Sequence, residues 1–167
     1  DYIITRLTES GTMPKNPAVV KTIVTTTLAD RIAKAANVKV FNVLTGFKFI
    51  GEKIKEWEKS GEYTFLFGYE ESYGYLRGTH ARDKDAVVAS MLTAEMVCYY
   101  ESVGKGLYKR LIELFDKFGY YREEVASIAY KGVTAMSDMS AAMSALRAKT
   151  IRSLAGYDVL AVSDYLK

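Results

Sequence analysis

The segment 67–84 carries the side chains of this chain that are best suited to binding a polar ligand. It gathers carboxylates, hydroxyls, cations and the only histidine of the chain: Tyr69, Glu70, Glu71, Ser72, Tyr73, Tyr75, Arg77, His80, Arg82, Asp83 and Lys84. A carboxylate can accept two hydrogen bonds from neighbouring hydroxyl groups, and a serine hydroxyl can both donate and accept. This combination is typical of a loop that grips a polyhydroxylated ligand such as a sugar.

Glu70 and Ser72 are the first candidates for such binding. They are separated by one residue and closely follow an apolar, strand-like segment, 63–67. If the extended geometry continues this far, their side chains project to the same side, and Glu71 faces the other way into a structural ion pair. The alternative is that all three are solvated loop residues, and the loop alone leaves both interpretations open.

Three cations follow in the same loop. His80, Arg82 and Lys84 alternate along the chain before a long predicted helix. Side chains of this kind could hold a phosphate oxygen or balance the charge of Glu70. A lone histidine in a loop is more often incidental than catalytic, so His80 is the weaker candidate.

Lys48 lies at the start of another predicted helix, in the sequence Thr-Gly-Phe-Lys at 45–48. A cation there opposes the helix dipole, which favours a role in meeting an anionic ligand or in moving a proton. The alternative is that its aliphatic stem packs over the same face of the sheet as Trp57. Asp83 and Asp85, by contrast, stand where the dipole of the following helix favours acids.

The elements that must position these residues alternate between strand and helix. The predicted strands are 19–26, 38–44 and 63–67, and helices 28–36 and 47–60 lie between them. Further helices are predicted at 2–9, 83–103, 106–118 and 137–149. Residues 125–130 could form a fourth, antiparallel edge strand, and a short strand is expected at 156–162. This order predicts an α/β fold with a mixed, mostly parallel sheet of about four strands flanked by helices.

Ligands of open parallel sheets bind outside the carboxyl ends of the strands. We therefore expect the loops 25–28, 44–48 and 68–84 to converge. The threonines at 25–27 form a hydroxyl-rich helix start, but helix capping explains them, and they are left outside the predicted site. The three tyrosines of the last loop could stack on a sugar ring or pack beside the strand.

Composition describes an ordinary globular chain. Its 167 residues include 23 basic and 20 acidic ones, a net charge of +3, which argues against a nucleic-acid or membrane-surface partner. No apolar stretch reaches the roughly 18 residues of a membrane span. The single cysteine, Cys98, is expected to be buried and suits a reducing, cytoplasmic location. The chain opens as if inside a helix and without methionine, so we expect a piece of a longer polypeptide.

Three motifs together resemble the α-D-phosphohexomutases, the family of phosphoglucomutase and phosphomannomutase. Residues 68–74, Gly-Tyr-Glu-Glu-Ser-Tyr-Gly, resemble the family's sugar-binding loop, which usually reads Gly-Glu-x-Ser. Residues 45–51 resemble its Thr-Gly-aromatic-Lys element, and residues 80–85 resemble its stretch ending in Lys-Asp-Gly. The resemblance covers residues 1–130, as the third, sugar-binding domain, and residues 131–167 resemble a linker helix and the lead-in to the last domain.

The resemblance implies roles for the candidate residues. Glu70 and Ser72 would hold the O3 and O4 hydroxyls of a hexose phosphate, and Lys48 would line the same site. Lys84 and His80 would transfer protons or stabilise charge. The implied reaction is an isomerisation of carbohydrate metabolism by intramolecular phosphoryl transfer between O1 and O6, through a hexose 1,6-bisphosphate intermediate. The sequence departs from the pattern at Tyr69, where the family usually has glycine before the glutamate.

Other parts of the family's machinery are absent from this sequence. It has no phosphoserine loop, no Asp-Gly-Asp-Gly-Asp segment for Mg²⁺ and no Arg-x-Ser-Gly-Thr phosphate clamp. The resemblance therefore implies that Mg²⁺ is bound by the other domains of a parent enzyme, that this chain has no metal ligand, and that it is inactive alone. Two alternatives stay open: a stand-alone phosphosugar- or carbohydrate-binding module without catalysis, and an α/β scaffold for protein contacts.

Overall fold

The computed structural model describes residues 1–166 and divides the chain into two compact units, Asp1–Glu124 and Val125–Lys167. The division falls close to residue 130, where the sequence suggested a domain limit. The first unit contains all the predicted site residues. The assignment of the second unit to a linker helix and the start of a further domain stays a prediction.

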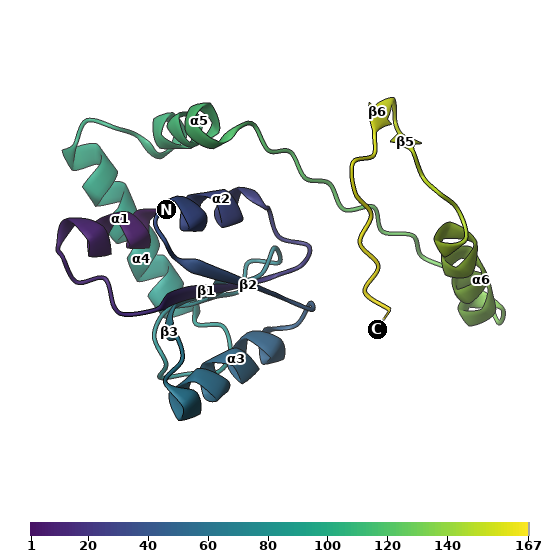
Figure 1. The fold of residues 1–167 in the computed structure, drawn as a ribbon, viewed down its shortest axis with the longest axis horizontal. Helices are drawn as coiled ribbons and strands as arrows, with labels where there is room; N and C mark the ends of the chain where they lie inside the picture. Colours follow the sequence, from purple (N-terminus) through teal and green to yellow (C-terminus); the bar gives the residue numbers. More distant parts are fainter. Residues whose placement is uncertain (167) are drawn as a thin grey trace. The chain divides into compact units, whose positions relative to one another are not determined.

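The first unit is built around a four-stranded sheet with the order β2-β1-β3-β4 (Figure 1). Its strands are β1 Pro17–Thr22, β2 Lys39–Val43, β3 Thr64–Tyr69 and β4 Tyr75–Leu76. Strand β1 pairs in parallel with β2 and β3, whereas β4 is antiparallel to β3. The predicted mixed, mostly parallel α/β sheet is confirmed.

The fourth strand is not the one that the sequence suggested. The segment 125–130 forms no strand, and its Val125 and Ile128 side chains are exposed. A β-branched and aromatic run favours extended backbone, but a strand also needs a neighbouring strand, and 125–130 pairs with none within residues 1–166. Strand β4 has only two residues, which is too short for an alternating pattern to reveal.

Helices form the two outer layers of the first unit. They are α1 Tyr2–Glu9, α2 Leu28–Ala35, α3 Phe47–Ser60, α4 Ala86–Ser102 and α5 Leu107–Phe118. Helix α3 covers one face of the sheet, and α1 and α2 cover the other (Figure 1). Right-handed crossovers explain this arrangement, because the chain runs from β1 outward to β2 through α2 and then back across the sheet to β3 through α3.

The alternation of side chains along β1 feeds both cores. Ala18 and Val20 face α3 and contact a cluster that includes Ile50 and Ile54, while Val19 faces the opposite cluster with Ala33, Val38 and Leu66. Ile50 and Ile54 are at most 1% exposed, so each contributes about 1.5–3 kcal/mol by leaving water. This packing fixes the start of α3, on which Lys48 lies.

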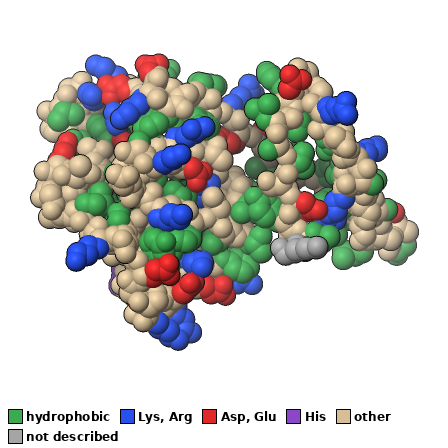
Figure 2. Space-filling view, viewed as in Figure 1, with side chains coloured by type: hydrophobic (Ala, Val, Ile, Leu, Met, Phe, Trp, Pro, Cys, Tyr) green, Lys and Arg blue, Asp and Glu red, His purple; other side chains and the backbone are tan. Residues whose placement is uncertain are grey.

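Helix α4 exposes apolar side chains. Val87, Met91 and Val97 reach solvent, and so does Cys98, which the sequence suggested would be buried. That expectation was wrong because α4 is apolar on all sides, so its pattern does not reveal which face is inside. An apolar cavity of about 450 Å³ lies among α1, α2, α4 and the sheet. Figure 2 shows hydrophobic side chains at the surface among scattered charges.

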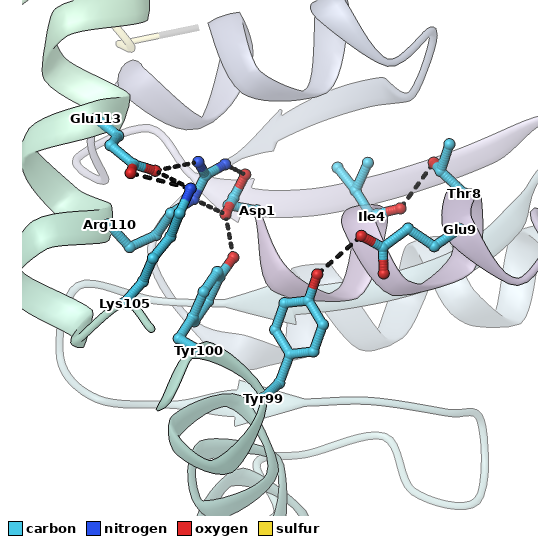
Figure 3. Close-up of polar contacts among 9 residues, drawn as sticks. All are labelled: Asp1, Ile4, Thr8, Glu9, Tyr99, Tyr100, Lys105, Arg110 and Glu113. Carbon is cyan, nitrogen blue, oxygen red and sulfur yellow. Dashed lines mark hydrogen bonds and ion pairs between the residues drawn. The ribbon is translucent and has the colours of Figure 1, made fainter. Parts of the chain in front are cut away.

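A polar network ties α1, α4 and α5 together (Figure 3). Arg110 donates to both carboxylate oxygens of Asp1 over 2.9 Å, and the Tyr100 hydroxyl donates to the same carboxylate over 2.6 Å. Arg110 and Lys105 also pair with Glu113, and hydrogen bonds from Lys105 and Arg110 hold the pKa of Glu113 below its usual value. Helices α4 and α5 are thereby held to the start of the N-terminal helix.

The second unit contains α6 Ala135–Arg147 and the short strands β5 Ser153–Leu154 and β6 Tyr157–Asp158. The two strands pair as an antiparallel hairpin, so the strand expected within 156–162 begins there but is much shorter. Arg147 forms a bidentate pair with Asp164 at 2.7 and 3.2 Å. Across residues 1–166, no helix is long and apolar enough to cross a membrane.

Candidate functional site

The predicted site lies in a tight turn after β3. The strand ends at Tyr69, and the Glu70 amide donates to the Gly74 carbonyl over 2.9 Å, which reverses the chain toward β4. Tyr73 takes a positive φ of 64° to complete the reversal. The expected extended backbone through Ser72 was therefore wrong. A turn into a neighbouring antiparallel strand replaces it, so Glu70 and Ser72 are not alternate residues of one strand.

Glu70 is largely buried, with 8% of its surface exposed. Its Oε1 accepts a hydrogen bond from the Gly46 amide over 3.0 Å, at the start of α3, where the helix dipole favours a negative charge. Its Oε2 accepts no hydrogen bond from the described residues. Among these residues, every fully buried side-chain oxygen has a hydrogen-bond partner. Oε2 must therefore reach solvent. One carboxylate oxygen of Glu70 anchors the turn, and the other accepts no hydrogen bond from the described residues.

Gly74 is a point of close approach between the turn and its neighbours. A Cβ atom at this position would lie 2.8 Å from Glu70 Oε2, 3.1 Å from Lys84 Cδ and 3.3 Å from Phe47 Cδ2. Glu70 and the stem of Lys84 thus flank the same glycine, although they are far apart in sequence. The Lys84 ammonium lies 3.1 Å from Asp83 Oδ1 and 6.0 Å from the centre of the Phe47 ring.

Lys48 is an exposed cation on the first turn of α3. Its ammonium lies 4.8 Å from the centre of the Phe49 ring, and it forms no ion pair within residues 1–166. The alternative, that the stem of Lys48 packs over the same face of the sheet as Trp57, stays a prediction. The first turn of α3 carries no acidic residue, so the charge of Lys48 adds to the positive helix start.

His80 is held at the start of α4. Its Nε2 lies 2.8 Å from Asp85 Oδ2, while Asp85 Oδ1 accepts hydrogen bonds from the Val87 and Val88 amides over 2.9 and 3.0 Å. The predicted place of Asp85 at the helix start is confirmed. The hydrogen bond from His80 holds the pKa of Asp85 below its usual value. No hydrogen bond or ion pair joins His80 to Glu70 among the described residues, so the structure does not bring these two together.

The loop before α4 is pressed against α3 at Gly51. A Cβ on Gly51 would lie 2.6 Å from the Arg82 carbonyl oxygen, which only glycine permits. The Arg82 guanidinium pairs with Glu58 of α3 and donates to the Thr79 carbonyl over 2.6 Å. Arg82 therefore has a structural partner, and its place fixes the path of the chain toward Lys84.

Ser72 and Tyr73 are exposed at the tip of the turn. Tyr73 is 86% exposed, and the Ser72 hydroxyl makes no hydrogen bond within residues 1–166. The rings of Tyr69 and Tyr75 instead flank Phe67, with centroids 5.6 and 6.1 Å away, and burial raises the pKa of Tyr69. Packing beside the strand thus describes Tyr69 and Tyr75, whereas Tyr73 projects into solvent.

The sequence did not reveal a polar cluster at the end of β1. The Thr22 hydroxyl lies 2.8 Å from Glu71 Oε2 and 2.6 Å from the Thr25 hydroxyl. Lys21 is 1% exposed, and its ammonium donates to the Thr25 carbonyl over 3.0 Å and lies 3.3 Å from Asp30. The sequence feature that could have indicated this cluster was the presence of a lysine and a threonine, Lys21 and Thr22, in a strand that is buried on both faces. Glu71 thus has a structural contact, with a hydroxyl rather than a cation.

The three predicted loops do converge. Glu70 joins the last loop to Gly46 of the second, and Glu71 joins it to Thr22, which is hydrogen-bonded to Thr25 of the first. In this sheet order, the carboxyl ends of β1 and β3 form the switch point at which open α/β sheets bind ligands. Within residues 1–166, no group of three or more His, Cys, Asp or Glu side chains is placed to hold a metal ion.

Comparison with known proteins gives a family for this arrangement. The model for phosphoglucomutase/phosphomannomutase, alpha/beta/alpha domain III, matches residues 2–118. The chain belongs to this family. Residues 2–118 lie within the first unit and include the three motifs, so the phosphohexomutase resemblance and its third-domain assignment are confirmed.

Relatives in this family are much longer than the chain. The phosphoglucomutase of Staphylococcus haemolyticus (strain JCSC1435) is 36% identical over 163 residues, which cover 98% of the chain and 29% of that protein. A Staphylococcus saprophyticus phosphoglucomutase is 33% identical over 147 residues, covering 88% of the chain and 27% of that protein. A solved structure described as a phosphomannomutase from Thermus thermophilus matches with a TM-score of 0.54 and 25% identity, over 78% of the chain and 29% of that structure. The chain spans less than a third of each.

Proposed function

We propose that this chain is the sugar-binding domain of a phosphohexomutase and that Glu70 and Ser72 hold hydroxyl groups of a hexose phosphate. The observation that carries this proposal is the divided carboxylate of Glu70, with Oε1 fixed by the Gly46 amide and Oε2 open to solvent. An ionised carboxylate accepts hydrogen bonds from sugar hydroxyls, and a fixed one loses little freedom on binding. The exposed Ser72 hydroxyl two residues later offers a second polar contact.

Lys48 and Lys84 supply the positive charge of the proposed site. Lys48 extends from the first turn of α3, two residues after Gly46, and the stem of Lys84 flanks Gly74. In phosphoryl transfer the protein contributes mainly positioning and charge stabilisation. We assign both lysines to the phosphate-bearing side of the substrate, and His80 to a secondary role in proton transfer near the start of α4.

The parent reaction is proposed to be phosphoryl transfer between O1 and O6 of a hexose phosphate, through a hexose 1,6-bisphosphate. Mg²⁺ would be held outside this chain, because its described residues do not fit a metal site. The family match favours an enzymatic parent over a stand-alone binding module. On this proposal the chain alone is catalytically inactive and only recognises the sugar.

The other domains of the parent chain are the proposed macromolecular partners. Relatives are more than three times as long as this chain, and the exposed apolar face of α4, which includes Val87 and Met91, is the surface we expect them to cover. The parent is proposed to work in the cytoplasm, since the only cysteine, Cys98, is a free thiol of the kind that reducing compartments preserve.

Glu70→Gln in the parent enzyme tests the proposal. The substitution keeps the shape of the side chain and removes its charge, so kcat/KM for a hexose phosphate should fall about 10- to 150-fold, the equivalent of about 1.5–3 kcal/mol for a charge-assisted hydrogen bond. Glu52→Gln, an exposed glutamate on α3, is the matched control and should be silent. Wild-type kinetics for Glu70→Gln would remove Glu70 from the site.

A further inference from the structure

We propose that Thr22 and Glu71 form a latch, the hydrogen bond between the Thr22 hydroxyl and the Glu71 carboxylate, that positions Glu70 for the sugar. This inference rests on the proposed function, because it assigns Glu71 to holding the sugar-binding turn rather than to contacting the ligand. The bond spans 2.8 Å and joins residues 49 positions apart in sequence.

The latch has a rigid base in the centre of the sheet. Thr22 is fully buried at the end of β1, between β2 and β3. Behind it, the ammonium of the buried Lys21 holds the Thr25 carbonyl and lies beside Asp30. No fully buried side-chain polar atom within residues 1–166 lacks a partner, and a fully satisfied polar network rigidifies the structure around it.

Donor and acceptor roles in this network have only one solution. An ionised Glu71 carboxylate can only accept, so the single proton of the Thr22 hydroxyl must point to Glu71. The Thr25 hydroxyl, 2.6 Å from Thr22, must then donate to Thr22. The chain of hydrogen bonds thus runs from Thr25 through Thr22 to Glu71, and each bond polarises the next.

The latch acts on Glu70 because the two glutamates are consecutive in one tight turn. Glu71 ties the turn to β1, while Glu70 ties it to Gly46 in the loop that leads to α3. The turn is therefore fixed on two sides before any ligand arrives. A ligand that meets a fixed carboxylate does not have to order the turn, which strengthens binding. If the Thr22 hydroxyl is removed, the contact between Glu70 and Gly46 is the only one of these two side-chain contacts that still holds the turn.

Isotope-labelled chain allows the latch to be tested apart from sugar binding. Thr22→Val removes the hydroxyl with little change in shape, and Thr22→Ser keeps it as the matched control. Without ligand, Thr22→Val should speed amide hydrogen exchange at Gly46 and Glu70 and shift both resonances, and Thr22→Ser should restore them. With glucose 1-phosphate, Thr22→Val should weaken binding about two- to tenfold.

Because Thr22 is buried, its substitution could destabilise the whole sheet, so a second variant at the exposed Glu71 tests the same hydrogen bond. Glu71→Ala should reproduce the faster exchange at Gly46 without changing the urea unfolding of the sheet. The latch is overturned if Gly46 and Glu70 exchange as in the wild type in both variants. If those amides loosen as expected but the wild-type chain does not respond to glucose 1-phosphate, the latch stands and the proposed function fails.

Discussion

Gly74→Ala is a substitution whose effect follows from distances in the site. The new methyl group would lie 2.8 Å from Glu70 Oε2 and 3.1 Å from Lys84 Cδ, where carbon atoms normally keep at least about 3.4 Å. The third neighbour, Phe47 Cδ2 at 3.3 Å, belongs to the buried core, whereas the Glu70 carboxylate and the Lys84 stem are side-chain ends that can move. The Glu70 carboxylate should swing away from the methyl group and release the Gly46 amide.

The expected change in the free energy of unfolding is the difference between a loss and a gain. Loss of the charge-assisted hydrogen bond to Gly46 costs about 1.5–3 kcal/mol. Replacing a glycine that lacks a positive φ by alanine returns about 0.4–1 kcal/mol by restricting the unfolded chain. The expected net loss in the free energy of unfolding is therefore about 1–2 kcal/mol, together with at least a tenfold loss of affinity for glucose 1-phosphate because Oε2 has moved.

Urea unfolding followed by circular dichroism measures the first quantity, and the Gly46 amide resonance reports the hydrogen bond directly. Gly106→Ala is the matched control, since its Cβ would meet nothing closer than 3.6 Å. It should not lower the free energy of unfolding and should raise it by at most about 1 kcal/mol. A Gly74→Ala chain that is as stable as the wild type and keeps its Gly46 resonance would refute the arrangement around Gly74.

Three further predictions concern the frame of the site. Gly51→Ala should lower the free energy of unfolding by about 1–3 kcal/mol in urea, because its Cβ would meet the Arg82 carbonyl oxygen at 2.6 Å. Arg110→Met should lower it by about 1–3 kcal/mol, because it leaves the largely buried Asp1 carboxylate without its bidentate partner. The hydrogen bond from His80 lowers the pKa of Asp85 in the folded state. The ionised Asp85 therefore stabilises the fold fully above its unfolded pKa, near 4, and this stabilisation is lost as the pH falls through the lower folded pKa. Asp85→Asn, which keeps the helix cap, should therefore flatten the dependence of the urea midpoint on pH between about 5 and 2.

Each of these has a clear contrary outcome. Unchanged stability in Gly51→Ala would mean that the loop before α4 does not touch α3. Wild-type stability in Arg110→Met would mean that the network of Figure 3 does not hold α5 in place. A pH profile of Asp85→Asn that parallels the wild type would assign the acid sensitivity to other carboxylates.

The architecture was largely predictable because its signals are local. The β-branched run before Thr26 and the apolar spacing of Phe47, Ile50, Ile54 and Trp57 depend on residues close in sequence, and they gave the parallel strands and α3. Helix α4 was predicted as a helix, but its buried face was not, because apolar residues surround it. The orientation of such a helix depends on neighbours that its own sequence does not describe.

The site residues were predicted by type and motif, but their geometry was not. Tyr73 adopts a positive φ without being glycine, so nothing in the local pattern announced the turn that separates Glu70 from Ser72. The contacts of Glu70 with Gly46 and of Glu71 with Thr22 join residues 24 and 49 positions apart. Such contacts arise from strand order, which sequence patterns constrain only weakly.

The central claim is that the turn at Glu70 binds a hexose phosphate, and a titration of the isotope-labelled chain with glucose 1-phosphate tests it most directly. We predict saturable shifts at the amides of Gly46, Glu70, Ser72 and Gly74, and their loss in Glu70→Gln. Absence of these shifts at millimolar sugar phosphate, or equal shifts in the wild type and in Glu70→Gln, would contradict the account.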